Sequence, residues 1–186
     1  MAIIPSKYFL TKGVGTHEKE LRAKGNALRE AGVETCNLVK ISSIIPPGCK
    51  RISKEEGCAL LKKGQIAFAV IAMSQRNEPG QMISAAIGLA QPKDEKMHGY
   101  LAEVEESVGH TAEDAVQDAE EMAIENLVMA FGQQDFDGNS VWEKEQKEYK
   151  VQGHEFDVDN IVSSTKGSPG NVYTVVIAIA IMIYEH

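Results

Sequence analysis

An apolar run close to the end of the chain limits the fold more than any other feature of the sequence. Residues 172–184 are 13 consecutive positions without a charged side chain. A helix that spans a membrane needs about 20 such residues, so the run is too short to cross one. Runs of this kind are typical of buried strands. We therefore expect residues 171–184 to form a long buried strand, and we expect no association with a membrane.

Turn residues divide the rest of the chain into further strands and helices. Strands are predicted over residues 7–10, 36–41, 65–74, 81–91 and 99–105. Helices are predicted from Thr16 to Ala31, from Ser53 to near Gly64, and over residues 111–131. A length of 186 residues suits a single domain, residues 1–186. The mixture predicts an α+β fold, a layered αββα sandwich in which helices cover the sheets.

The helix limits rest on capping signals. Thr16 can cap the first helix, and Gly32 is a typical stop signal. Ser53 and Glu56 have the spacing of a capping box. In the helix over residues 111–131, apolar side chains recur at helical spacing and acidic side chains lie outside that stripe.

Two other segments lie between the predicted elements. Glu78, Pro79 and Gly80 form a turn signal between two apolar runs, which predicts a β-hairpin. Residues 132–160 are polar and irregular, with Trp142 as the most prominent anchor. We interpret this second segment as an insertion or a flap.

Composition excludes several classes of function. The formal net charge is −8, whereas a nucleic-acid-binding protein needs a basic face to meet the phosphates. Three cysteines without a Cys-x-x-Cys pair indicate neither a disulfide framework nor a zinc site, and they fit reduced thiols in the cytoplasm. The histidines lack the spacing of metal ligands, so no metal is expected. No nucleophile elbow and no P-loop are present, which argues against serine hydrolysis and nucleotide hydrolysis.

The segment with the most chemical information covers residues 37–47, which read NLVKISSIIPP. It is an apolar strand that ends in two serines, followed by two isoleucines and two prolines. Because proline cannot donate to a strand ladder, the strand must stop there. Ser42 and Ser43 are therefore placed at a corner between a strand and a loop. By spacing alone, they are ordinary turn residues.

This segment resembles the self-cleavage site of the pyruvoyl-dependent arginine decarboxylases. Further matches follow in order: Pro79-Gly80, residues 83–87 (ISAAI), residues 92–94 (PKD) and residues 99–103 (GYLAE). The resemblance covers most of residues 7–131 and the final strand, and it weakens over residues 132–160.

The resemblance implies a self-processing enzyme. The hydroxyl of Ser43 would attack the carbonyl carbon of Ser42, and elimination would release residues 1–42 as a β chain. Residues 43–186 would form an α chain that begins with a covalent pyruvoyl group derived from Ser43. That group would form a Schiff base with a small-molecule amino acid and decarboxylate it, most simply L-arginine to agmatine. The family's sites lie between the subunits of a trimer, which implies a homo-oligomer built on trimers.

Two further residues take their roles from the same resemblance. Asn37 matches a catalytic asparagine that donates a hydrogen bond during processing or substrate binding. A straight strand would separate Asn37 from Ser43 by roughly 20 Å, so either different subunits would have to supply them or the chain would have to fold back. Glu103 matches a catalytic glutamate that returns a proton after decarboxylation. From pattern alone, Asn37 is a satisfied strand-end amide and Glu103 a solvated carboxylate, like its neighbour Glu105.

One position departs from the family pattern. The aspartate expected to pair with the substrate guanidinium falls on Gly25, with Lys24, Arg22 and Arg29 nearby. Glu18, Glu20 or a partner subunit would have to supply the anion, so the substrate-binding residues stay unknown. Three alternatives therefore remain open: a decarboxylase of an acidic amino acid, an uncleaved trimeric binding or regulatory protein, and an unrelated α+β enzyme.

Overall fold

Two β-sheets are stacked face to face in the computed structural model, which describes residues 3–108, 111–132, 142–143, 148–151 and 153–184. The first sheet has the order β2 (Asn37–Lys40), β5 (Ile66–Arg76), β11 (Tyr173–Ile183), β1 (Lys7–His17) and β4 (Lys50–Arg51). The second has the order β3 (Ile44–Ile45), β7 (Gly99–Val108), β6 (Met82–Pro92), β10 (His154–Lys166), β9 (Glu148–Val151) and β8 (Trp142–Glu143).

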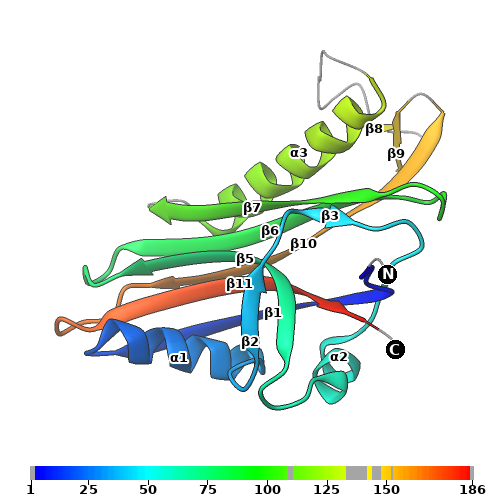
Figure 1. Cartoon of the computed structure of the whole chain (residues 1–186). Helices are drawn as coiled ribbons and strands as arrows, with labels where there is room; N and C mark the ends of the chain where they lie inside the picture. Colours follow the sequence, from blue (N-terminus) through cyan, green and yellow to red (C-terminus); the bar gives the residue numbers. More distant parts are fainter. Residues whose placement is uncertain (1–2, 109–110, 133–141, 144–147, 152, 185–186) are drawn as a thin grey trace.

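Three helices of the described part of the chain cover the outer faces of the sheets. Helices α1 (Glu20–Ala31) and α2 (Lys54–Leu60) lie against the first sheet, and α3 (Ala112–Ala130) lies against the second (Figure 1). Layers therefore follow in the order helix, sheet, sheet, helix. This arrangement confirms the predicted α+β sandwich.

The final apolar run lies at the centre of this arrangement, as predicted. Strand β11 pairs with β1 on one side and β5 on the other, and every residue after Tyr173 is buried. Alternate side chains face the second sheet, as Val176 does, or the helices α1 and α2, as Ile177 does. Because both faces are covered, the strand needs no polar positions.

The first helix begins later than predicted. Thr16 does not cap it, because β1 continues through His17 and pairs there with Tyr173. The helix starts at Glu20, and Lys19 at its N-cap makes no side-chain capping bond. Gly32 ends the helix in the left-handed conformation, with φ of 81°, as predicted.

The capping box predicted at the second helix is confirmed, and a second box is present at the third. Ser53 and Glu56 form both bonds of a capping box at α2, although the helix ends at Leu60 rather than near Gly64. Thr111 and Asp114 form the same box at α3.

The predicted hairpin after residue 65 is wrong. Strand β5 belongs to the first sheet and β6 to the second, so the turn at Pro79 and Gly80 passes from one sheet to the other. Strand β6 is buried from Ile83 to Ala90 because the first sheet covers one face and α3 the other. Two apolar runs around a turn fit a crossing between stacked sheets as well as they fit a hairpin.

The segment over residues 132–160 is more regular than predicted. From His154 onward it forms β10, which pairs with β6 along its length from Phe156. Strands β8 and β9 extend the same sheet at its edge. Residues 133–141, 144–147 and 152 lie outside the described part of the chain, so the insertion or flap stays a prediction.

The chain crosses between the sheets at residues 41–43. Strand β2 is one edge of the first sheet and β3 is one edge of the second, and Figure 1 shows β2 rising toward β3. The two serines singled out in the sequence therefore lie on a bridge between two sheet edges.

No helix among the described residues is long and apolar enough to cross a membrane.

Candidate functional site

The crossing segment is anchored to β7. The amide of Leu101 donates a hydrogen bond to the carbonyl oxygen of Ser43 at 2.8 Å. Ile44 and Ile45 then pair with Tyr100 and Gly99. Strand β3 ends there, because Pro46 follows and has no amide hydrogen to donate. The backbone around Ser43 therefore has a fixed position relative to β7.

The segment turns sharply at Ser43. The amide of Ile44 donates to the carbonyl oxygen of Ser42 at 3.0 Å, which closes a three-residue turn centred on Ser43. Among the described residues, Asn171 is the only non-glycine residue with a positive φ. The corner predicted at the serine pair is therefore present, and it is formed without left-handed backbone strain.

Ser43 and Glu103 are in direct contact. The Ser43 hydroxyl donates to Glu103 Oε2 at 2.5 Å. Glu103 lies on β7 opposite Ile87 of β6, and its side chain is only 20% exposed. This short hydrogen bond joins two of the residues that the sequence singled out, one on the crossing segment and one on β7.

Lys40 lies between two carboxylates of β7. Its Nζ is 2.6 Å from Glu105 Oε1 and 3.8 Å from Glu103 Oε1. Sequence patterns did not single out Lys40. The available signal was the i, i+2 pair of carboxylates, since two anions on one strand face attract a cation from a neighbouring strand.

A pocket of about 230 Å³ opens at the serine pair. Helix α3 contributes Met122 and Asn126, which the sequence analysis also missed. The remaining lining comes from the crossing segment and β7. It consists of Ser42, Ser43, Ile44, Tyr100, Leu101, Ala102 and Glu103.

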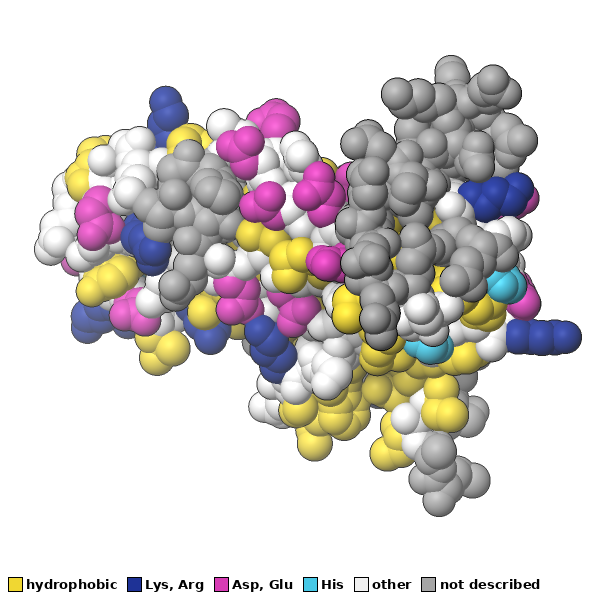
Figure 2. Space-filling model, turned by 90° about the horizontal axis from the view of Figure 1, so that it is seen from above, with side chains coloured by type: hydrophobic (Ala, Val, Ile, Leu, Met, Phe, Trp, Pro, Cys, Tyr) yellow, Lys and Arg dark blue, Asp and Glu magenta, His cyan; other side chains and the backbone are white. Residues whose placement is uncertain are grey.

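A second groove of about 490 Å³ adjoins this pocket and shares Glu103 and Met122 with it. It lies between β7 and α3, and its carboxylates are Glu103, Glu105, Asp118, Glu121 and Glu125. Figure 2, which views this side of the molecule, shows acidic side chains gathered here. We call this feature the acidic groove. Its charge favours a cation beside Ser43.

Asn37 does not join Ser43 within one chain. It begins β2, whereas Ser43 lies beyond the other end of that strand. Its side-chain amide donates to the carbonyl oxygen of Gly64 at 2.8 Å, and its backbone amide donates to Gln65. The separation expected from strand geometry is therefore present.

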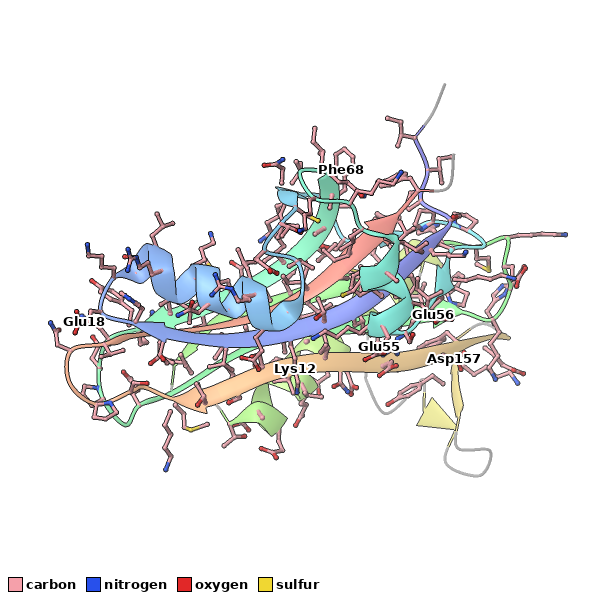
Figure 3. All side chains as sticks on the ribbon, turned by 90° about the horizontal axis from the view of Figure 1, so that it is seen from below. Lys12, Glu18, Glu55, Glu56, Phe68 and Asp157 are labelled. Carbon is pink, nitrogen blue, oxygen red and sulfur yellow. The ribbon has the colours of Figure 1, made fainter. Side chains whose placement is uncertain are left out.

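Helix α1 also lies away from the pocket. A Cβ at Gly25 would have no neighbour within 4 Å, and Glu20 accepts a hydrogen bond from Gln75. Figure 3 shows Glu18 at one end of the molecule, far from Phe68, which pairs with Val39 of β2. Neither glutamate lines the pocket of its own chain. Among the described residues, no group of three or more acidic, cysteine or histidine side chains could hold a metal ion.

Comparisons with known proteins give one consistent result. Residues 7–186 match the family model described as pyruvoyl-dependent arginine decarboxylase. A protein of Chlorobaculum tepidum named a probable pyruvoyl-dependent arginine decarboxylase is 44% identical, over 98% of this chain and 99% of that protein. The pyruvoyl-dependent arginine decarboxylase of Nitrosopumilus maritimus is 40% identical, over 97% and 98%. That of Methanococcoides burtonii is 39% identical, over 97% and 99%.

Proposed function

This chain belongs to the pyruvoyl-dependent arginine decarboxylase family, and from this premise we propose that it cuts itself between Ser42 and Ser43 and converts L-arginine to agmatine and carbon dioxide. The observation that carries the proposal is the 2.5 Å hydrogen bond from Ser43 to Glu103 inside a pocket. A serine hydroxyl held against a half-buried carboxylate is prepared to lose its proton.

The residues at the cut suit the formation of a pyruvoyl group at position 43. Ser43 has the hydroxyl that must attack, and the turn brings the Ser42 carbonyl next to an amide donor. The group supplies an electron-withdrawing carbonyl, which stabilises the electron pair left when carbon dioxide departs. The pocket lined by Tyr100 and Met122 leaves room for a small amino acid beside position 43.

Glu103 is proposed to move protons in both reactions. During cleavage, its Oε2 takes the proton of the Ser43 hydroxyl. After decarboxylation, the same carboxyl group returns a proton to the substrate carbon. A single residue can act in both self-cleavage and decarboxylation because both reactions take place at position 43, next to Glu103 Oε2.

The acidic groove supports a cationic substrate over an acidic one. A guanidinium is attracted to carboxylates such as Glu121 and Glu125, whereas a substrate carboxylate is repelled. Lys40 pairs with Glu105 and compensates only part of this charge. The groove can therefore take the place of the aspartate that is absent at Gly25.

We further propose that the chain assembles into homo-oligomers built on trimers. Strand β2 is a sheet edge with half-exposed Val39, and Ile66 beside it is 60% exposed. A second copy on this edge would bury both and bring its own Asn37 toward a neighbouring pocket.

The described cysteines Cys36, Cys49 and Cys58 are free thiols, which supports a location in the cytoplasm.

The test is to purify the protein and follow both reactions. Mass spectrometry is expected to find a fragment of residues 1–42 and a fragment of residues 43–186 with a blocked N-terminus. Carbon dioxide release is expected with arginine. One intact chain after prolonged incubation, or cut protein without activity on any basic amino acid, would contradict the proposal.

A further inference from the structure

We propose that self-cleavage needs only one copy of the chain, and that the backbone amide of Ile44 stabilises the charge that develops on the Ser42 carbonyl oxygen. This inference rests on the proposed function, because it concerns how the cut is made. By this mechanism the Ile44 amide acts on a reacting atom, and cleavage does not depend on assembly.

Three contacts of a single chain carry the inference. The Ile44 amide donates to the Ser42 carbonyl oxygen at 3.0 Å. The Leu101 amide donates to the Ser43 carbonyl oxygen at 2.8 Å. The Ser43 hydroxyl donates to Glu103 at 2.5 Å. The Ser42 carbonyl that is attacked, the Ser43 hydroxyl that attacks and the Glu103 carboxylate that accepts the proton thus all belong to the crossing segment or to β7 of one chain.

The acyl shift follows from these contacts with atoms and charges balanced. Ser43 Oγ forms a bond to the Ser42 carbonyl carbon, and its proton passes to Glu103 Oε2. The carbonyl electron pair moves onto the Ser42 oxygen, where the Ile44 amide donates to it. The carbon–nitrogen bond then breaks, and the Ser43 nitrogen takes the proton back from Glu103. The product is an ester with a free amine, and no co-reactant is needed.

The turn geometry explains why the Ile44 amide suits this role. A hydrogen bond from an amide strengthens when a neutral carbonyl oxygen becomes an oxyanion. The donor is part of the backbone and is held by the pairing of Ile44 with Tyr100, so it needs no reorganisation during the reaction. Donors placed in this way reduce the barrier of acyl transfer in other proteins.

Asn37 has no part in cleavage by this account. Its side-chain amide is bound to Gly64 at the far end of β2. Of the two roles that the sequence left open for Asn37, substrate binding therefore remains. An Asn37→Ala chain is expected to be cut and then to turn over substrate slowly.

The first test compares cleavage rates across concentrations. Labelled full-length precursor is made by cell-free synthesis and diluted until size-exclusion chromatography shows single chains. The first-order rate of cleavage should stay constant over roughly a thousandfold range of concentration, because no second copy takes part. A rate that falls with dilution overturns the inference but leaves the proposed function intact. Absence of cleavage at every concentration overturns the proposed function itself.

The second test is complementation between two inactive chains. Ser43→Ala lacks the nucleophile and Glu103→Gln lacks the proton acceptor, and each is co-expressed with the other under a different tag. The Glu103→Gln chain should be cut at least about 10²-fold more slowly than wild type, alone or in the mixture. Rescue in the mixture would show that Glu103 acts across chains and overturn the inference, as would an unchanged rate for Glu103→Gln alone.

The third test removes the amide itself. Ile44→Pro lacks the donor, and proline at this position also disfavours the turn at Ser43. Cleavage should slow by about 10²-fold to 10³-fold, the usual loss for one oxyanion donor. Ile44→Val keeps the amide and should cleave at least about tenfold faster than Ile44→Pro. A folded Ile44→Pro chain that cleaves as fast as Ile44→Val overturns the role of the amide. If circular dichroism shows that Ile44→Pro does not fold, cell-free synthesis with the α-hydroxy acid analogue of isoleucine at position 44 replaces the amide by an ester and keeps the side chain. Cleavage of that chain as fast as wild type then overturns the role of the amide.

Discussion

Ser43 Oγ and Glu103 Oε2 lie 2.5 Å apart although 60 residues separate them along the chain. The contact exists because the chain crosses from β2 to β3 at the serine pair and then pairs with β7, which carries Glu103. Cleavage would leave Lys40 on one fragment and both Glu103 and Glu105 on the other. The Lys40–Glu105 pair, at 2.6 Å, therefore also joins the two sides of the cut.

The first prediction concerns the two serines. Ser43→Ala should leave a single intact chain, because the attacking hydroxyl is gone. Ser42→Ala should still be cut, since only the backbone carbonyl of Ser42 reacts. Mass spectrometry of the two purified variants distinguishes them. Cleavage of Ser43→Ala at the wild-type rate would show that the Ser43 hydroxyl is not the nucleophile.

The second prediction concerns turnover by Glu103. Some Glu103→Gln chains are expected to be cut slowly. Carbon dioxide release per cut chain should be lower than in wild type on the order of 10²-fold or more, because glutamine cannot return a proton. The matched control is Glu113→Gln on α3, which removes the same charge away from the pocket. Glu105→Gln should have an intermediate effect, since it frees Lys40 near Glu103. A Glu103→Gln enzyme with normal turnover per cut chain would contradict the role of Glu103.

Sequence patterns predicted the elements that follow from local chemistry. The 19-residue helix α3, the buried strand β11 and the capping box at Ser53 were all visible in the residues themselves. The hairpin and the Thr16 cap were wrong because partner choice in a sheet depends on distant residues. Strand β1 continues past Thr16 only because β11 is there to pair with it.

The site shows the same limit. Resemblance to a family placed Ser42, Ser43 and Glu103, and the fold brings them together. Periodicity could not reveal Met122 or Asn126, because both are ordinary positions of an amphipathic helix until β7 lies beside them. The doubt raised by Gly25 concerned a helix that contributes no residue to the lining of the pocket in its own chain.

The third prediction concerns Lys40. Lys40→Met should lower turnover by less than about tenfold, because an exposed ion pair contributes roughly 0–1 kcal/mol. Lys40→Arg should recover most of the loss, since it restores a cation between Glu103 and Glu105. Recovery by arginine separates an electrostatic effect from lost packing. Lys63→Met is the control for charge at an exposed position away from the pocket. Equal turnover in Lys40→Met and Lys63→Met would leave Lys40 without a role.

The fourth prediction concerns the substrate. Carbon dioxide release is measured side by side with arginine, lysine, ornithine, aspartate and glutamate, and the acidic groove predicts the highest kcat/KM for a cationic substrate. Removing one charge-assisted contact with Glu121→Gln or Glu125→Gln should raise KM for arginine by about tenfold while changing kcat less. The reason is that these side chains contact the groove but lie away from Ser43.

Two controls make this prediction specific to the groove. Glu113→Gln lies on the same helix and removes the same charge, yet it does not line the groove, so its KM should match wild type. Gly25→Asp restores the carboxylate of the family pattern on α1. If Gly25→Asp lowers KM for arginine while Glu121→Gln and Glu125→Gln leave it unchanged, α1 of a neighbouring copy selects the substrate. In that case the acidic groove only attracts cations to the surface. A preference for aspartate or glutamate would instead show that the acidic groove does not repel an acidic substrate, and the assignment of arginine as substrate would fail.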